Sequence, residues 1–277
     1  MSSFEELLRK AALNAPSQPP TSSVTKQVLF MPQKYIDLSK TMGSGLSKES
    51  SDTIPERIEG AVAPHSLIAI PGKLVKVHLP DGDIRYMSGL YSPRECQLII
   101  QKLAEDRQRN SALWERFGKG RLVVQWSRPG GMRYVFSDVE YIASSFPAFV
   151  EKIRQEVINI LRPIYGIDTT EFNYCVCNCY MTGLAGVNWH TDSEPHLVPG
   201  CPIACVSFGS ERVFSLAKIP RTVTESPNSV LNVRLESGSM IVMAGETQQH
   251  YLHAIAKEAS VREPRFSLTF RVNYPKS

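Results

Sequence analysis

The chain has 277 residues, 42% of them hydrophobic and 21% charged, which is enough for one large domain or two small ones around a sizeable core. A formal net charge of +4 permits an anionic partner but does not require one. No apolar run of about 18 residues is visible, so we expect no membrane span. No signal peptide is visible either, so we expect a location in the nucleus or cytoplasm. In such a compartment the six cysteines are expected to be reduced.

Residues 1–65 differ in composition from the rest of the chain. Ser3 and Glu6 have the spacing of a capping box, and Phe4, Leu7 and Leu8 form a short helical stripe after it. Stretches rich in Ser, Pro and Thr follow, among them NAPSQPPTSS and SGLSKESSDTIPE. This pattern predicts a flexible N-terminal arm around a small docking segment.

From Pro71 onward the pattern is that of a folded domain. Two strands are expected in LVKVHLP and DIRYMSG, joined by a DGD turn. Ser92, Pro93 and Glu95 mark the start of a helix, because they supply an N-cap, a proline at the first position and an acid at the third. Two further strand-like runs surround a Pro-Gly-Gly turn in GKGRLVVQWSRPGGMRYVFSD, which suggests a hairpin. A second amphipathic helix is expected over residues 146–164.

Residues 173–274 carry no comparable helical signal. Short runs of Val, Ile, Phe and Tyr alternate there with Gly, Pro and Asn, a spacing typical of a sandwich or a jelly roll. Two helices followed by many strands predict a β-rich domain with helical buttresses.

The segment NWHTDSEP contains His190 and Asp192, two positions apart. On a strand or its extended exit, both side chains point the same way and could hold one cation. With one more histidine they would form the two-histidine, one-carboxylate set of non-haem Fe(II) sites. Alone the pair is a weak signal, because surface loops contain it by chance. His196, His250 and His253 all follow, and periodicity does not choose among them.

The last predicted strand, RFSLTFRV, alternates apolar and polar residues. An edge strand with a solvated face would explain this pattern. The alternative is a cationic lining inside the fold, in which two arginines about 20 Å apart bracket a short diacid. The polar face carries Arg265, Ser267, Thr269 and Arg271.

A second strand, in NYCVCNCYM, places Asn178 and Tyr180 on one face and three cysteines on the other. The two polar residues are either satisfied core groups or hydrogen-bond partners of a carboxylate beside a metal. For Cys175, Cys177 and Cys179, burial in the core is favoured over a soft-metal site.

Taken in order, these stretches resemble the AlkB-type Fe(II)/2-oxoglutarate dioxygenases, which remove alkyl groups from nucleobases. NCYMTG resembles the family's Asn-x-Tyr-x-x-Gly, and HTD follows twelve residues after Asn178. The later segments PIACVSFGSERVF, ESGSMIVMAGETQQHYLH and PRFSLTFR resemble its remaining motifs. The match covers residues 173–272, and its order and spacing make chance an unsatisfactory explanation.

The resemblance implies a mainly β fold with flanking helices: a double-stranded β-helix, or jelly roll, with an N-terminal α/β lid extension. The dioxygenase domain would cover residues 66–277, with a nucleotide-recognition lid region at 66–145 and the catalytic core at 173–274. Fe(II) would bind His190, Asp192 and His253, because His253 and not His250 matches the distal ligand position. The residues that would hold 2-oxoglutarate are Asn178, Tyr180, Arg265, Ser267 and Arg271. The family often has Asn where this chain has Ser267, so one hydrogen bond would be weaker or remade through water.

The resemblance also implies substrate-binding residues. Tyr134 and Phe136 in YVFS would line the base pocket, with Phe136 stacking on an extruded base and Trp126 beside them. Core aromatics on a hairpin explain these residues equally well. Glu194 would accept from a base amino group, whereas Ser193 departs from the acidic pair that the family often carries. Arginines on the same hairpin could contact phosphates: Arg121, Arg128 and Arg133.

The function that the resemblance implies is oxidative demethylation of N1-methyladenine and N3-methylcytosine in DNA or RNA. Fe(II) would be the metal, 2-oxoglutarate and O2 the co-substrates, and formaldehyde, succinate and CO2 the products. We expect a monomer that does not bind membranes. The alternatives are a 2-oxoglutarate oxygenase acting on a protein or lipid, and a non-catalytic nucleic-acid binder on the same fold.

Overall fold

The computed structural model describes residues 71–274, apart from 118–119, 137–138, 166–171, 193, 195 and 221–226. The predicted N-terminal arm, with its capping box and helical stripe, therefore lies outside the described residues. Within the described part of the chain, no helix is long and apolar enough to cross a membrane.

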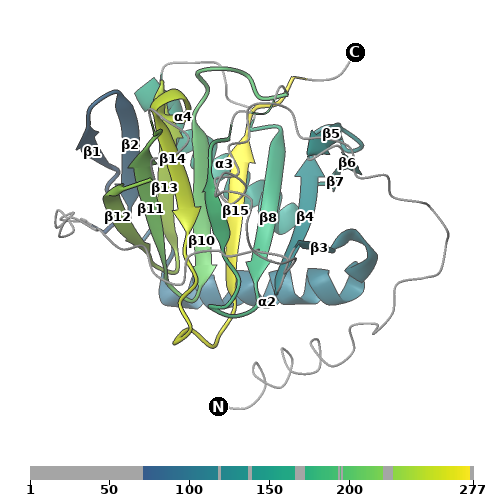
Figure 1. Cartoon of the computed structure of the whole chain (residues 1–277). Helices are drawn as coiled ribbons and strands as arrows, with labels where there is room; N and C mark the ends of the chain where they lie inside the picture. Colours follow the sequence, from purple (N-terminus) through teal and green to yellow (C-terminus); the bar gives the residue numbers. More distant parts are fainter. Residues whose placement is uncertain are drawn as a thin grey trace, which may run out of the picture.

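Two facing β-sheets form the body of the domain (Figure 1). The main sheet has the order β1-β2-β13-β10-β15-β8-β4-β3, with β7 pairing in parallel on β4, and the minor sheet has the order β12-β11-β14-β9. The main-sheet strands are β1 (Val75–Leu79), β2 (Gly82–Met87), β3 (Glu115–Phe117), β4 (Arg121–Ser127), β7 (Ser144–Ser145), β8 (Tyr174–Tyr180), β10 (Ile203–Gly209), β13 (Ser239–Ala244) and β15 (Arg265–Arg271). The minor-sheet strands are β9 (Val187–His190), β11 (Arg212–Lys218), β12 (Ser229–Leu235) and β14 (Tyr251–Ile255). This arrangement confirms the predicted jelly roll.

Helices cover the outer face of the main sheet. In Figure 1, α2 (Pro93–Arg109) runs across the lower end of the strands and α3 (Ala148–Tyr165) lies behind them. The predicted capping box starts α2: the Ser92 backbone N–H donates to Glu95 Oε2 at 2.8 Å, and the Glu95 N–H donates to Ser92 Oγ. Leu103 and Val157 are fully buried against this face of the sheet, and burying each such side chain stabilises the fold by about 1.5–3 kcal/mol. Shorter helices are η2 (Ser111–Leu113) and α4 (Thr247–His250).

The three strand cysteines belong to this helix-facing core, as predicted. Cys175, Cys177 and Cys179 are fully buried in β8, among apolar side chains of α2 and α3. Burial raises the pKa of the Cys179 thiol to about 12, so the thiol stays protonated. A second core, between the two sheets, contains Ile84 and Leu216.

The predicted hairpin around the Pro-Gly-Gly turn is wrong. β4 pairs with β8 along one edge and with β3 and β7 along the other, which leaves no edge for β5 (Arg133–Phe136). β5 pairs instead with β6 (Val139–Ile142), and the two form a small separate sheet. The strands of the predicted lid region are thus divided: β1 to β4 extend the main sheet, and only β5 and β6 stand apart.

Candidate active site

Two strands of the minor sheet bring the proposed metal ligands together. His190 is the last residue of β9, and the register of β9 and β14 pairs it with His253, so that the ring centroids are 4.1 Å apart. Asp192 follows β9 and lies between the two rings, with Oδ1 3.7 Å from His190 Nε2 and Oδ2 4.0 Å from His253 Nε2. The three donor atoms lie within 4.8 Å of one another. His250 ends the short helix α4 and is not part of this group.

Neighbouring groups hold these donors in place. His190 Nδ1 lies 2.8 Å from the Asn188 carbonyl oxygen, a contact that leaves Nε2 as the ligand atom. The Asp192 backbone N–H donates to Gln248 Oε1 at 2.8 Å, and the Phe214 ring stacks on His253 at 5.4 Å. Asn188, Phe214 and Gln248 were not identified from the sequence, since no pattern along the chain links them to the ligands.

Burial holds the pKa of His253 well below its ordinary value, and the nearby charges of His190 and Arg271 lower it further. The imidazole is therefore neutral at physiological pH, which is the state that binds a metal. Two imidazoles and one carboxylate, with Asp192 only 4% exposed, are a donor set that fits Fe(II).

The lowered pKa of His253 predicts how the stability of the metal-free protein depends on pH. Below about pH 6.5 the unfolded chain protonates this histidine while the folded chain does not, so stability falls as the pH falls, by up to about 1.4 kcal/mol per pH unit. Urea unfolding of chelator-treated protein at pH 7.5 and 5.5 measures the effect. His253→Asn should reduce the pH dependence, whereas exposed His250→Ala should keep it. Equal pH dependence in all three proteins would contradict the assignment.

The predicted arginines lie inside the fold. β15 lies between β10 and β8, so RFSLTFRV is a central strand and not a solvated edge. At its metal end, Arg271 Nη2 lies 2.9 Å from Asp192 Oδ1, and Arg271 Nη1 lies 3.3 Å from Glu194 Oε1. Glu194 was predicted to accept a hydrogen bond from the amino group of a base. In the structure it contacts Arg271 beside the metal ligands.

At the other end of β15, Arg265 is 2% exposed and donates to Ser207 Oγ at 2.9 Å. Its guanidinium carbon lies 5.2 Å from the centre of the Tyr180 ring. Among the described residues, Arg265 has no carboxylate partner, and its Nε and Nη1 have no hydrogen-bond acceptor. A buried cation without a counter-charge is costly in free energy, and binding of an anionic ligand would compensate this cost.

The other predicted co-substrate residues share this face. The register of β8 and β15 pairs Asn178 with Ser267 and Tyr180 with Arg265. The five predicted residues therefore line one surface from the buried arginine to the metal ligands. A dicarboxylate such as 2-oxoglutarate fits this surface, because one carboxylate would meet Arg265 while the other end reaches the metal.

The predicted substrate residues are separated by the fold. Trp126 points into the helix-facing core, where it is 1% exposed and packs edge-on against Trp114 at 6.3 Å. Its predicted substrate contact is therefore corrected to a packing role, because alternate β4 residues face opposite sides of the sheet. The backbone register of β5 and β6 places Tyr134 opposite Tyr141 and Phe136 opposite Val139.

Two of the arginines expected at phosphates are paired with carboxylates. Arg128 lies 3.2 Å from Glu151, and Arg133 lies 2.8 Å from Glu140. Arg121 stacks over the Phe117 ring at 5.4 Å. The two ion pairs, of Arg128 with Glu151 and of Arg133 with Glu140, offset part of the positive charge that the sequence suggested for this region.

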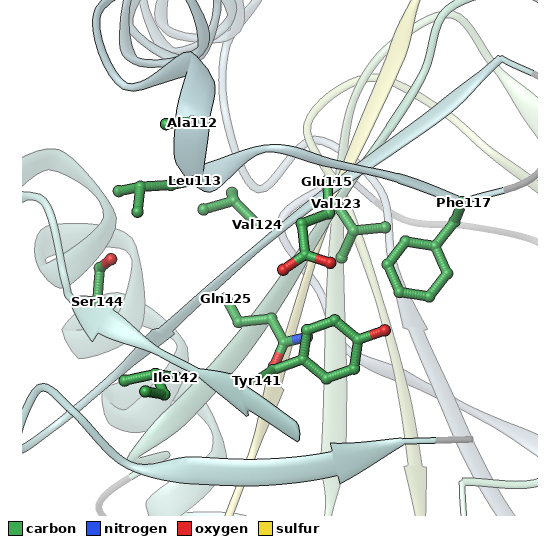
Figure 2. Close-up of a pocket in the computed structure, with 10 residues that line it drawn as sticks. All are labelled: Ala112, Leu113, Glu115, Phe117, Val123, Val124, Gln125, Tyr141, Ile142 and Ser144. Carbon is green, nitrogen blue, oxygen red and sulfur yellow. The ribbon is translucent and has the colours of Figure 1, made fainter. Parts of the chain in front are cut away.

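A hollow of about 80 Å³ opens at the edge of the main sheet, and none of the three metal ligands lines it (Figure 2). Figure 2 shows the Glu115 carboxylate directed toward Gln125 and Tyr141. Burial raises the pKa of Tyr141 to about 12, and the Glu115 charge acts in the same direction. Gln125 accepts a hydrogen bond from the Tyr174 hydroxyl, which links the hollow to the inner face of β8. We assign the chemistry to the metal ligands and not to this hollow, because only the former combine suitable donor atoms.

Comparisons with known proteins agree with this geometry. The family model described as the 2OG-Fe(II) oxygenase superfamily matches residues 83–271. The human alpha-ketoglutarate-dependent dioxygenase alkB homolog 3 is 39% identical over 108 residues, which cover 38% of this chain and 37% of that protein. The bovine DNA oxidative demethylase ALKBH2 is 30% identical over 198 residues, and the alignment covers 67% of each chain. The human ALKBH2 is 29% identical over 191 residues, which cover 66% of this chain and 70% of that protein.

The solved structure of OsALKBH1 superposes with a TM-score of 0.49 at 18% identity, covering 71% of this chain and 99% of the other. The present chain spans little more than a third of the length of the alkB homolog 3 proteins that it matches. The family model, by contrast, extends over most of the described residues and includes all three metal ligands. The chain is an AlkB-like member of the 2OG-Fe(II) oxygenase superfamily, homologous to the DNA oxidative demethylase ALKBH2 and to the alpha-ketoglutarate-dependent dioxygenase alkB homolog 3.

Proposed function

We propose that this enzyme oxidatively demethylates alkylated bases of the N1-methyladenine and N3-methylcytosine type in DNA or RNA. The observation that carries the proposal is the group of His190, Asp192 and His253 at one end of β15, together with the buried Arg265, which has no carboxylate partner in the described residues, at the other end. The names of the relatives support the choice of substrate, since ALKBH2 is a DNA oxidative demethylase and its bovine form aligns over two thirds of both chains.

In the proposed reaction, His190, Asp192 and His253 would hold Fe(II), which would supply the activation of O2. Arg265, with Tyr180 beside it, would bind the distal carboxylate of 2-oxoglutarate, and the polar face of β15 would direct the 2-oxo acid end toward His190, Asp192 and His253. One oxygen atom of O2 ends in succinate as CO2 leaves. The other enters the N-methyl group, and the resulting hydroxymethyl group is released as formaldehyde.

We place the substrate strand on the side of the β5–β6 hairpin. Tyr134 and Phe136 lie on β5, and stacking of an extruded base on an aromatic ring is a common means of holding it for chemistry. The hollow lined by Phe117, Gln125 and Tyr141 lies beside this hairpin and offers aromatic and amide surfaces to a neighbouring nucleotide.

The test is mass spectrometry of reactions with Fe(II), 2-oxoglutarate and a panel of methylated DNA and RNA oligomers, single- and double-stranded. We expect loss of a methyl group from at least one oligomer, with formaldehyde and succinate formed in equal amounts. Heat-treated enzyme and unmethylated oligomers are the controls. Turnover of 2-oxoglutarate without demethylation of any oligomer would contradict the nucleobase substrate and favour a protein or lipid substrate.

A further inference from the structure

Arg212, the first residue of β11, is fully buried and held from several sides. Its Nη2 donates to the carbonyl oxygens of Ala185, at 2.8 Å, and Ala256, and its Nε lies 3.3 Å from Glu258 Oε1. These acceptors come from two segments: Ala185 lies between β8 and β9, and Ala256 and Glu258 follow β14. The Arg212 side chain is therefore fixed in one orientation by contacts from two separate parts of the chain.

Arg212 also lies against the predicted co-substrate site. Its guanidinium carbon is 5.8 Å from the centre of the Tyr180 ring, and that of Arg265 is 5.2 Å from the same ring. Tyr180 is 3% exposed, so two buried guanidiniums contact one buried ring. Burial lowers the pKa of Arg212, and the charge of Arg265 lowers it further, although Glu258 opposes the effect.

The charges at this end of the site do not balance. Among the described residues, Glu258 is the one carboxylate paired with Arg212, and none is paired with Arg265, so two cations face one anion. Three guanidinium nitrogens have no acceptor in the same set: Arg212 Nη1, Arg265 Nε and Arg265 Nη1. An excess positive charge in a buried place is costly unless an anionic ligand compensates it.

We propose that Arg212 is a positioning residue for the co-substrate: it holds Tyr180 in place beside Arg265 and adds a second positive charge where the distal carboxylate of 2-oxoglutarate binds. The proposal rests on 2-oxoglutarate being the co-substrate. It predicts that Arg212 strengthens binding of the distal carboxylate of 2-oxoglutarate and does not affect binding of the 2-oxo acid end or of the metal.

The contacts of Glu258 show that this part of the fold is built to hold Arg212. Glu258 Oε1 also accepts from the Val213 N–H at 2.9 Å, and the Glu258 N–H donates to the Gly183 carbonyl at 2.8 Å. A Cβ atom on Gly183 would lie 1.8 Å from the Glu258 carbonyl oxygen, so only glycine permits this approach. Arg234 lies 3.4 Å from Glu258 Oε2 with its side chain 53% exposed. Arg234 therefore shares the carboxylate, and no contact with Tyr180 is found for it in the described structure.

The shared carboxylate provides a matched control. The experiment compares three variants with the parent: Arg212→Met, Arg212→Lys and Arg234→Met. Each protein is loaded with Mn(II) in the absence of O2, and calorimetry measures its Kd for 2-oxoglutarate. A second ligand, 2-oxopentanoate, has the same chain length without the distal carboxylate. The KM for 2-oxoglutarate and kcat are then measured with Fe(II) and O2.

We expect Arg212→Met to raise the Kd and KM for 2-oxoglutarate about tenfold, with kcat at saturation changed less than about twofold. The Kd for 2-oxopentanoate should not change, Arg212→Lys should recover part of the affinity, and Arg234→Met should equal the parent. An unchanged Kd in Arg212→Met, or equal losses for both ligands, would overturn the proposal. If Arg212→Met does not fold, Arg212→Lys decides by the ratio of its two Kd values. Failure of the parent protein to bind 2-oxoglutarate would instead overturn the co-substrate assignment.

Discussion

Replacing Asp192 with alanine is expected to abolish 2-oxoglutarate turnover, with succinate formation falling by about a thousandfold or more. Asp192 is the one carboxylate of the ligand group, and its two oxygens each approach one of the imidazoles. Without it, two histidines remain, a set that binds Fe(II) weakly and leaves the positive charge of the metal uncompensated. Succinate measured by mass spectrometry and iron content measured after loading should fall together.

The control for this prediction is His250→Ala. His250 lies three residues before His253 in the same sequence motif, but its side chain is 43% exposed and it pairs with Glu246. This variant should keep the iron content and turnover of the parent. Retained activity in Asp192→Ala, or an equal loss in His250→Ala, would show that the ligand assignment is wrong.

Replacing Arg265 with methionine should raise the Kd for 2-oxoglutarate by about a hundredfold or more, because a buried charge-assisted contact to the distal carboxylate is lost. The same change should leave the melting temperature of the ligand-free protein unchanged or raise it. Arg265 is buried without a carboxylate partner in the described residues, and exchange of such a cation for an apolar side chain of similar size removes a desolvation cost. Calorimetry and thermal unfolding measure the two effects.

Loss of affinity with retained or increased stability would distinguish a ligand-binding arginine from a structural one. Arg262→Met is the control, because Arg262 is exposed and lies three residues earlier in the chain. It should change neither quantity. A large fall in melting temperature in Arg265→Met, with the Kd unchanged, would contradict the role assigned to Arg265.

Local patterns were sufficient for most of the elements. The spacing of Ser92, Pro93 and Glu95 predicted the start of α2, and the alternation in RFSLTFRV predicted β15 and its two faces. These features depend on neighbouring residues and on the period of a strand, both of which are readable along the chain. The predicted pairing of β4 with β5 was wrong because it does not depend on neighbouring residues. The partner of a strand depends on which distant segments already occupy its edges.

The sequence by itself determined the chemistry that is available: an HxD pair, downstream histidines, and two arginines on one face of a strand. The choice of His253 over His250 came from resemblance to a family, and the register of β9 and β14 supplies its physical basis. Only the tertiary structure decided that Arg265 is buried inside the sandwich and that Trp126 packs beneath the sheet. Only the tertiary structure showed that Arg212 lies against Tyr180, because a lone arginine at the start of a strand carries no local signal. The carbonyl groups that fix Arg212 come from two segments far apart in the sequence, at residues 183–185 and at residue 256.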